Sequence, residues 1–318
     1  MPALTDITNK IRESAKKLLA SGQAEVVIGY RQGTIPMTTS PFFARTADEC
    51  DLLVWSNFAR INLANYLPGR AGKVAMVAKG CDARSAIGQV TENQILKDNL
   101  YIIGVPCTGM IDTNLVVAKE ARPIREVVET ADDSITVKGQ GFSTDIKKDE
   151  VLRRNCRTCV NRTPKLANEL VGQEVNGAAA DDFADIKSLL AKTPAERMGY
   201  FKDLIKDCLR CYACRNACPL CYCPVCFVDE TRPQWLGKST DPMDTMTFHL
   251  LRGLHCAGRC TSCGACETAC PVNIKVREFN RVMELTVQNN WNYEPGLSWD
   301  QKPPLTMFQT DDAADFIK

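Results

Sequence analysis

The chain carries one cysteine pattern twice, first as Cys208-Leu-Arg-Cys211-Tyr-Ala-Cys214-Arg-Asn-Ala-Cys218-Pro219 and again as Cys260-Thr-Ser-Cys263-Gly-Ala-Cys266-Glu-Thr-Ala-Cys270-Pro271. This spacing, with its terminal Cys-Pro, is typical of chains that hold two 4Fe–4S clusters. A lone Cys-x-x-Cys could equally be half of a zinc ribbon or a redox dithiol. Two complete copies favour iron–sulfur clusters and predict that the protein moves electrons.

In this pattern three cysteines of each run bind one cluster, and the fourth reaches across to the other. Set A is therefore predicted to be Cys208, Cys211, Cys214 and Cys270. Set B is predicted to be Cys260, Cys263, Cys266 and Cys218. We expect a mostly helical, bacterial-ferredoxin-like dicluster domain over residues 183–290.

Composition narrows the setting of these cysteines. The 318 residues include 39 basic and 38 acidic side chains, with a formal net charge of +1, so neither nucleic acid nor an anionic membrane is an expected partner. The first ten residues contain no apolar signal segment, and no apolar run approaches the ~18 residues needed to span a bilayer. We therefore expect a soluble, cytoplasmic chain whose 17 cysteines are available to metal rather than held in disulfides.

The N-terminal part alternates between apolar strands and a helix. Residues 73–78 and 100–105 are apolar runs, and 83–96 between them has helical spacing. A strand, helix and strand in this order predict parallel strands covered on both faces. The expected fold is α/β, with a parallel-sheet domain over residues 1–170. Residues 291–318 form an aromatic-rich tail that either wraps on the body or docks on a partner.

Four more cysteines are expected to meet in this first domain. Cys81 and Cys107 directly follow the two predicted strands, at the sheet edge where α/β folds collect ligands. Neighbouring strands lie ~4.8 Å apart, so both thiols can approach one cluster, and the compact pair Cys156 and Cys159 would complete it. We call these four residues set C. The alternative is that Cys81 and Cys107 are small buried apolar residues.

Three segments also carry a resemblance to a known family. They are Lys79-Gly-Cys-Asp-Ala-Arg84, Ile103-Gly-Val-Pro-Cys-Thr-Gly-Met110 and Arg154-Asn-Cys-Arg-Thr-Cys159. Over residues 74–172 the chain resembles the beta subunits of deazaflavin-dependent hydrogenases and formate dehydrogenases, some of which have a similar ferredoxin module appended. The resemblance implies a third 4Fe–4S cluster on set C beside a flavin, with FAD near Lys79, Asp82 and Arg84. The segment 29–56 is, however, sparse in the Gly, Ser and Thr residues on which flavin and deazaflavin binding in that family usually draws.

The same resemblance implies a role within a hetero-oligomer. The chain would be an iron–sulfur subunit that relays electrons between a formate dehydrogenase or hydrogenase and a heterodisulfide-reductase-type complex. One alternative is a flavin-dependent enzyme that itself exchanges hydride with a deazaflavin or nicotinamide carrier, although no G-x-G-x-x-G nucleotide signature follows a strand. Another is a zinc-binding scaffold. A visible spectrum separates these functions.

The remaining cysteines leave two interpretations open. Cys221, Cys223, Cys226 and Cys256 either hold a fourth cluster or a zinc ion, with His255 as a spare ligand, or are inert thiols of the ferredoxin-like core. Cys50 has no nearby companion and is predicted to be buried. His249 is interpreted as a packing residue or a neighbour of the clusters rather than a catalyst.

Overall fold

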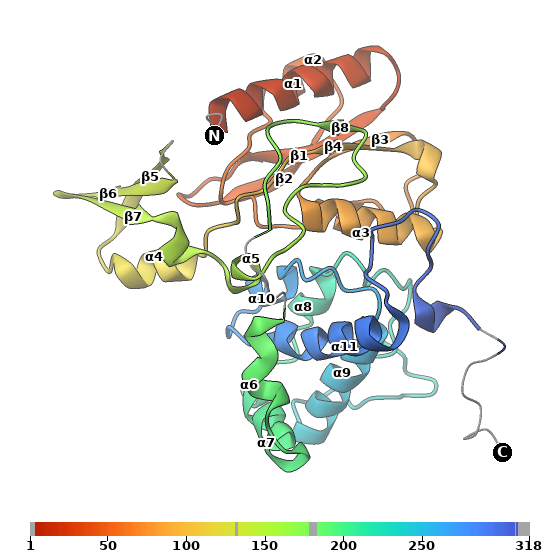
Figure 1. The fold of residues 1–318 in the computed structure, drawn as a ribbon. Coiled ribbons are helices and arrows are strands. Elements are labelled where there is room, and N and C mark those ends of the chain that lie inside the picture. The colour runs from red at the N-terminus through yellow and green to blue at the C-terminus, as the bar shows by residue number, and fades with distance from the viewer. Residues whose placement is uncertain (1–3, 131–132, 178–182, 309, 311–318) are drawn as a thin grey trace.

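The computed structural model describes residues 4–130, 133–177, 183–308 and 310. Its N-terminal part is built on a five-stranded sheet with the strand order β2-β1-β3-β4-β8 (Figure 1). The strands are β1 (Val26–Gln32), β2 (Thr39–Ala44), β3 (Val74–Ala78), β4 (Leu100–Gly104) and β8 (Glu169–Leu170). The pairs β1–β3, β3–β4 and β4–β8 are parallel, while β2 is an antiparallel edge strand. The predicted parallel sheet is confirmed at its centre.

Helices cover both faces of this sheet, which explains why its central strands are apolar throughout. Figure 1 shows α1 (Leu4–Ala20) on one side of the sheet and α3 (Gly80–Thr91) on the other. Every residue of β3 is buried. Ile7, Ile11 and Leu18 recur at helical spacing on the buried face of α1. This core fixes the strand ends from which Cys81 and Cys107 emerge.

A second, smaller sheet extends from the side of the domain (Figure 1). Its strands β5 (Ile124–Glu129), β6 (Ser134–Gly139) and β7 (Phe142–Lys147) are antiparallel. They pack with α4 (Thr113–Lys119) on a separate apolar core that includes Ile135 and Val137. This sheet precedes the segment that carries Cys156 and Cys159.

The C-terminal part is helical, as predicted. Its longer helices are α7 (Pro194–Ile205), α9 (Pro242–His255) and α11 (Val276–Trp291). The remaining helices of the described chain are α2 (Ala47–Cys50), α5 (Arg154–Arg157), α6 (Lys187–Leu190), α8 (Ala213–Asn216), α10 (Ala265–Thr268) and the 3-10 helices η1 (Leu63–Tyr66), η2 (Lys97–Asn99), η3 (Lys148–Val151), η4 (Ala184–Ile186) and η5 (Pro304–Thr306). Within the described ranges, no helix is both long enough and apolar enough to cross a bilayer.

The two cysteine runs have the same backbone conformation. Arg210 and Tyr212 in the first run have left-handed φ angles of 51° and 59°, and Ser262 and Gly264 at the matching positions of the second run have 54° and 69°. Each loop then enters a four-residue helix, α8 or α10, and these two helices pack together. The sequence repeat is thus also a structural repeat, with each loop wrapped around its first three cysteines.

Candidate metal centres

Set C is assembled by the ends of two adjacent parallel strands. Cys81 lies in the first turn of α3, directly after β3, and Cys107 follows β4, whose Gly104 pairs with Ala78 of β3. Cys156 lies in α5, and Cys159 follows two residues beyond its end. All four cysteines line one cavity, which Cys260 and Cys263 of set B also line. The cavity therefore lies where the α/β part meets the second cysteine run.

Set C combines buried thiols with backbone donors to sulfur. Burial raises the pKa of Cys81 and of Cys159, and it raises the pKa of Cys107 to about 12, with neighbouring set C cysteines contributing to each. A metal that binds these thiols would displace their protons. Two backbone N–H groups already point at sulfur, Gly109 at Cys107 and Met110 at Cys156, both at 3.3 Å. Donors of this kind stabilise cluster-bound sulfur and raise a cluster's reduction potential.

Set A combines three cysteines of the first run with Cys270, the last cysteine of the second run. Burial raises the pKa of both Cys208 and Cys214, and the nearby Cys270 raises both further. The N–H of Arg210 donates to the sulfur of Cys208 at 3.4 Å, and Nε2 of His249 lies 3.3 Å from the same sulfur. Burial and the charges of two neighbouring arginines lower the pKa of His249 to about 4, so this imidazole is neutral near pH 7.

Set B shows the reciprocal arrangement. Burial raises the pKa of Cys260, Cys263 and Cys266, and the charge of Cys218 from the first run contributes to all three shifts. The fourth cysteine of each run thus lies near cysteines of the other run: Cys270 near Cys208 and Cys214, and Cys218 near the first three cysteines of the second run. This exchange is the contact that the crossed ligand sets require.

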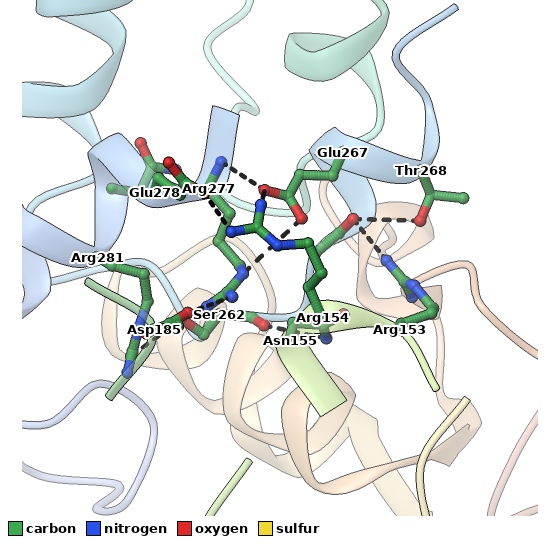
Figure 2. Close-up of polar contacts among 12 residues, drawn as sticks. Arg153, Arg154, Asn155, Asp185, Ser262, Glu267, Thr268, Arg277, Glu278 and Arg281 are labelled. Carbon is green, nitrogen blue, oxygen red and sulfur yellow. Dashed lines mark hydrogen bonds and ion pairs between the residues drawn. The ribbon is translucent and has the colours of Figure 1, made fainter. Parts of the chain in front are cut away.

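Two side chains from α5 and its N-cap join set C to the loop of set B. Nη2 of Arg153 donates to the carbonyl of Gly264 at 2.6 Å, and Nδ2 of Asn155 donates to the carbonyl of Cys263 at 3.0 Å. Figure 2 shows Arg153 and Thr268 converging on the same carbonyl oxygen. Gly264 has a positive φ, and a Cβ on it would lie 2.8 Å from atoms of both Arg153 and Asn155. Only glycine allows this close approach without strain.

Buried arginines beside the same cavity bring positive charge toward it. Arg277 and Arg281 are almost fully buried on α11 and line the cavity. Arg277 pairs with Asp185, and Arg281 pairs with Glu284 at 2.6 Å (the Arg277–Asp185 pair and its neighbours are shown in Figure 2). The Arg277–Asp185 pair ties α11 to η4, whereas Arg281 and Glu284 both belong to α11. Both guanidinium groups lie where they can offset the negative charge of a cluster.

The residues predicted to adjoin a flavin are engaged with each other or with the tail. Nζ of Lys79 lies 2.6 Å from Oδ2 of Asp82, and both side chains are buried. The same Nζ lies over the ring of Tyr30, whose hydroxyl donates to Oδ2 of Asp82 at 3.1 Å. Arg84 pairs with Glu294 at 3.0 Å and donates to the carbonyl of Pro295 at 2.8 Å. Their polar groups therefore hold the Cys81 loop and the tail in place. Lys79 and Arg84 also line the set C cavity, and a flavin beside these residues stays a prediction.

The first part of the tail wraps on the body and closes the set C cavity. Tyr293 is 3% exposed, and Tyr293, Glu294 and Pro295 line the cavity. Gly296 has a positive φ, and a Cβ there would lie 2.1 Å from the carbonyl oxygen of Arg84. Farther along, Leu305 and Phe308 are exposed, whereas Phe316 lies outside the described residues. Partner docking thus stays a prediction for the end of the tail.

A truncation tests this cover. A chain that ends at residue 290 should lose its brown absorbance in air much faster than a chain that ends at residue 303, because only the shorter one lacks Tyr293 and Glu294 over the cavity. The measurement is the decay of visible absorbance after exposure of anaerobically reconstituted protein to air. Equal decay of the two chains would show that the tail does not shield the centre.

The remaining cysteines regroup in a way that spacing did not predict. Cys221 and Cys256 meet Cys218, with all three sulfur atoms within 4.8 Å of one another. Cys223 is exposed, and Cys226 lies beside Arg215 instead. Cys50 is fully buried in the α/β core. Sequence reasoning missed Arg153, Asn155 and the buried Arg252, although the position of Asn155 directly before Cys156 was an available signal.

Together, the fold and these cysteine sets define an iron–sulfur electron-transfer protein. Residues 257–275 match the family model of the 4Fe-4S binding domain. The chain is 27% identical to the F420-dependent formate dehydrogenase subunit beta of Methanocaldococcus jannaschii, over 79% of each chain. It is 24% identical to the F420-dependent formate dehydrogenase 1 subunit beta of Methanococcus maripaludis, over 91% of this chain and 90% of that protein.

These matches confirm the resemblance found in the sequence: the chain is related to the beta-subunit family and carries a 4Fe–4S module. Among solved structures, the F420-reducing NiFe hydrogenase complex of Methanosarcina barkeri contains a chain with a TM-score of 0.40 and 14% identity. That match covers 52% of this chain and 66% of the other, which is less than two thirds of it. A match at this level establishes neither a common fold nor a common function for the two chains.

Proposed function

We propose that this chain is the iron–sulfur electron-transfer subunit of an F420-dependent formate dehydrogenase or hydrogenase complex. In this proposal it relays electrons between the catalytic partner and a heterodisulfide-reductase-type flavin and iron–sulfur complex. The two relatives, both named as beta subunits of F420-dependent formate dehydrogenases, support the first part. The observation that carries the proposal is that the three cysteine sets adjoin one another within a single chain.

The order of the relay follows from which sets touch. Set C shares its cavity with Cys260 and Cys263 of set B. Set B exchanges its fourth ligand with set A through Cys218 and Cys270. We infer that electrons pass between sets C and A by way of set B, and that three 4Fe–4S clusters occupy the three sets.

Set A provides the contact with a redox partner at the surface. Cys211 is exposed, and the neighbouring Leu209 is 58% exposed. Set C, by contrast, is enclosed by the tail, α11 and the α/β domain. An electron that reaches set A is therefore nearer to an outside acceptor than one on set C.

Purification from the native source tests this function directly. We expect a brown protein with about twelve irons per chain, as three 4Fe–4S clusters require, and we expect it to co-purify with larger redox subunits. A colourless, zinc-containing chain would instead support the scaffold alternative. Rapid turnover by the isolated monomer with a soluble deazaflavin or nicotinamide would contradict the role of a relay.

A second candidate function, flavin-dependent hydride exchange, draws on one specific cavity. A cavity of about 530 Å³ lies beside the loop of Cys107 and is lined by Trp55, Pro106, Thr108 and Lys148. Its size is within the usual range for a cofactor site. Nζ of Lys148 is buried there and donates to Oδ1 of Asn57 at 2.7 Å and to the hydroxyl of Thr108. These residues fit a planar aromatic cofactor such as FAD, which when bound would convert hydride transfer into single-electron steps.

The test for this cofactor is extraction. Acid-denatured protein should release a yellow, fluorescent compound if FAD is bound, and the Trp55→Ala variant should retain less of it while keeping its iron. Protein that releases no such compound after anaerobic purification would leave the relay function without a flavin.

A further inference from the structure

Three thiols beside set B come together without following the cluster spacing. The sulfur atoms of Cys218, Cys221 and Cys256 lie within 4.8 Å of one another. Cys256 is buried at the C-terminal end of α9, and Cys221 is partly exposed. The N–H of Cys221 donates to the carbonyl of Cys218 at 3.1 Å, so a tight turn holds these two residues close.

Two of these thiols are surplus to the proposed clusters. Cys218 belongs to set B, which leaves Cys221 and Cys256 without a metal. A structural metal site takes four protein ligands. Within the part of the chain that the structure describes, no further Cys, His or carboxylate joins this group, since Cys223 is exposed and Cys226 lies beside Arg215. Two adjacent thiols are instead what a dithiol–disulfide couple requires.

A buried cation accompanies the two thiols. Arg252 is 3% exposed, and its Nη2 donates to the carbonyl of Cys214 at 3.1 Å. Among the described residues, no carboxylate lies within ion-pair distance of this guanidinium, and its Nε has no hydrogen-bond partner. The charges that act on it come from sulfur, in the order Cys256, Cys218, Cys266 and Cys221. The sulfur atoms of the pair therefore lie beside a buried positive charge.

Building on the proposed electron-transfer function, we propose that Cys221 and Cys256 form a redox-active pair that exchanges electrons with the set B cluster. When the bond between the two sulfur atoms forms, the two thiols release two electrons and two protons. The electrons pass one at a time to the set B and set A clusters, and the protons pass to solvent. In the reverse direction two electrons from the clusters and two protons break the bond. The pair thereby links a two-electron reaction to the one-electron steps of the relay.

Thiol alkylation on the full-length chain tests the pair. Anaerobic protein is either reduced with dithionite or oxidised with a mild dye, then treated with N-ethylmaleimide and digested for mass spectrometry. We expect both thiols to be alkylated in the reduced sample, and a linked Cys221–Cys256 peptide in the oxidised one. Cys223→Ser is the matched control, because it removes an exposed neighbouring thiol and should leave the linked peptide in place. Alkylation of both thiols in both samples would overturn the proposal.

Electron counting separates this proposal from the relay itself. Wild-type chain should take up about two electrons more in a reductive titration than Cys221→Ser or Cys256→Ser, and both variants should keep their full iron content. Loss of about four irons in either variant would overturn the pair by making that cysteine a cluster ligand. A chain that holds all its clusters and passes electrons, but whose variants take up as many electrons as wild type, would also overturn it. The electron-transfer function itself would fail only if wild-type chain lacked clusters or did not pass electrons.

Discussion

Replacing Cys214 with serine should remove one 4Fe–4S cluster and loosen the whole C-terminal module. Cys214 is buried in the apolar core of that module, with Cys266, Phe248 and Val276 in the same core. Small cluster-binding domains depend on the metal for their fold, because little apolar surface is available to replace it. Iron should fall by about four per chain, and the melting temperature should fall with it.

The matched control is Cys50→Ala. Cys50 is also fully buried, but it lies in the α/β core and away from all three sets. This variant should keep its iron and sulfide at the wild-type level, which separates loss of a ligand from loss of a buried thiol. Unchanged iron and sulfide in the Cys214→Ser variant would refute the assignment of this cysteine to a cluster.

The parts of the fold that were predictable from sequence depend on local patterns. The cysteine repeat, with its matching left-handed residues at Arg210 and Ser262, needs only residues within one run. The apolar strands β3 and β4 were recognisable because both faces of the sheet are covered. Strands β5 and β7 were not, because exposed charged side chains such as Arg125 and Asp145 interrupt their apolar pattern.

The arrangement of the centres depends instead on distant contacts. Asn155 meets Cys263 across 108 positions, and Arg84 meets Pro295 across 211. Spacing within a motif carries no information about such pairs. For the same reason, the four surplus cysteines that looked like one group in sequence separate in the structure, and two of them join Cys218. Whether the tail wraps on the body or docks on a partner could likewise be examined only once the position of Tyr293 was known.

Loss of the set C centre should have a different signature from loss of the set A centre. Cys107→Ser removes a thiol that lies after β4, at the edge of the α/β core and outside the core of the C-terminal module. Iron should again fall by about four per chain, but the two clusters of the module should keep their spectra and the module should keep its melting temperature. Electron paramagnetic resonance of the reduced protein, together with iron analysis, measures both effects.

Within the assembled complex, the same Cys107→Ser variant should nearly abolish electron transfer between the catalytic partner and the heterodisulfide-reductase-type complex. Set C is the one proposed centre of the α/β domain, and Asn155 and Arg153 connect its segment directly to the loop of set B. An electron that enters beside the Cys107 loop would then have no centre from which to reach set B. The measurement is the rate at which the purified complex transfers electrons between these two partners. The control is the Cys50→Ala variant in the same complex. If the Cys107→Ser complex lacks four irons per chain yet transfers electrons at the wild-type rate, set C lies off the path and the inferred order of the relay is wrong.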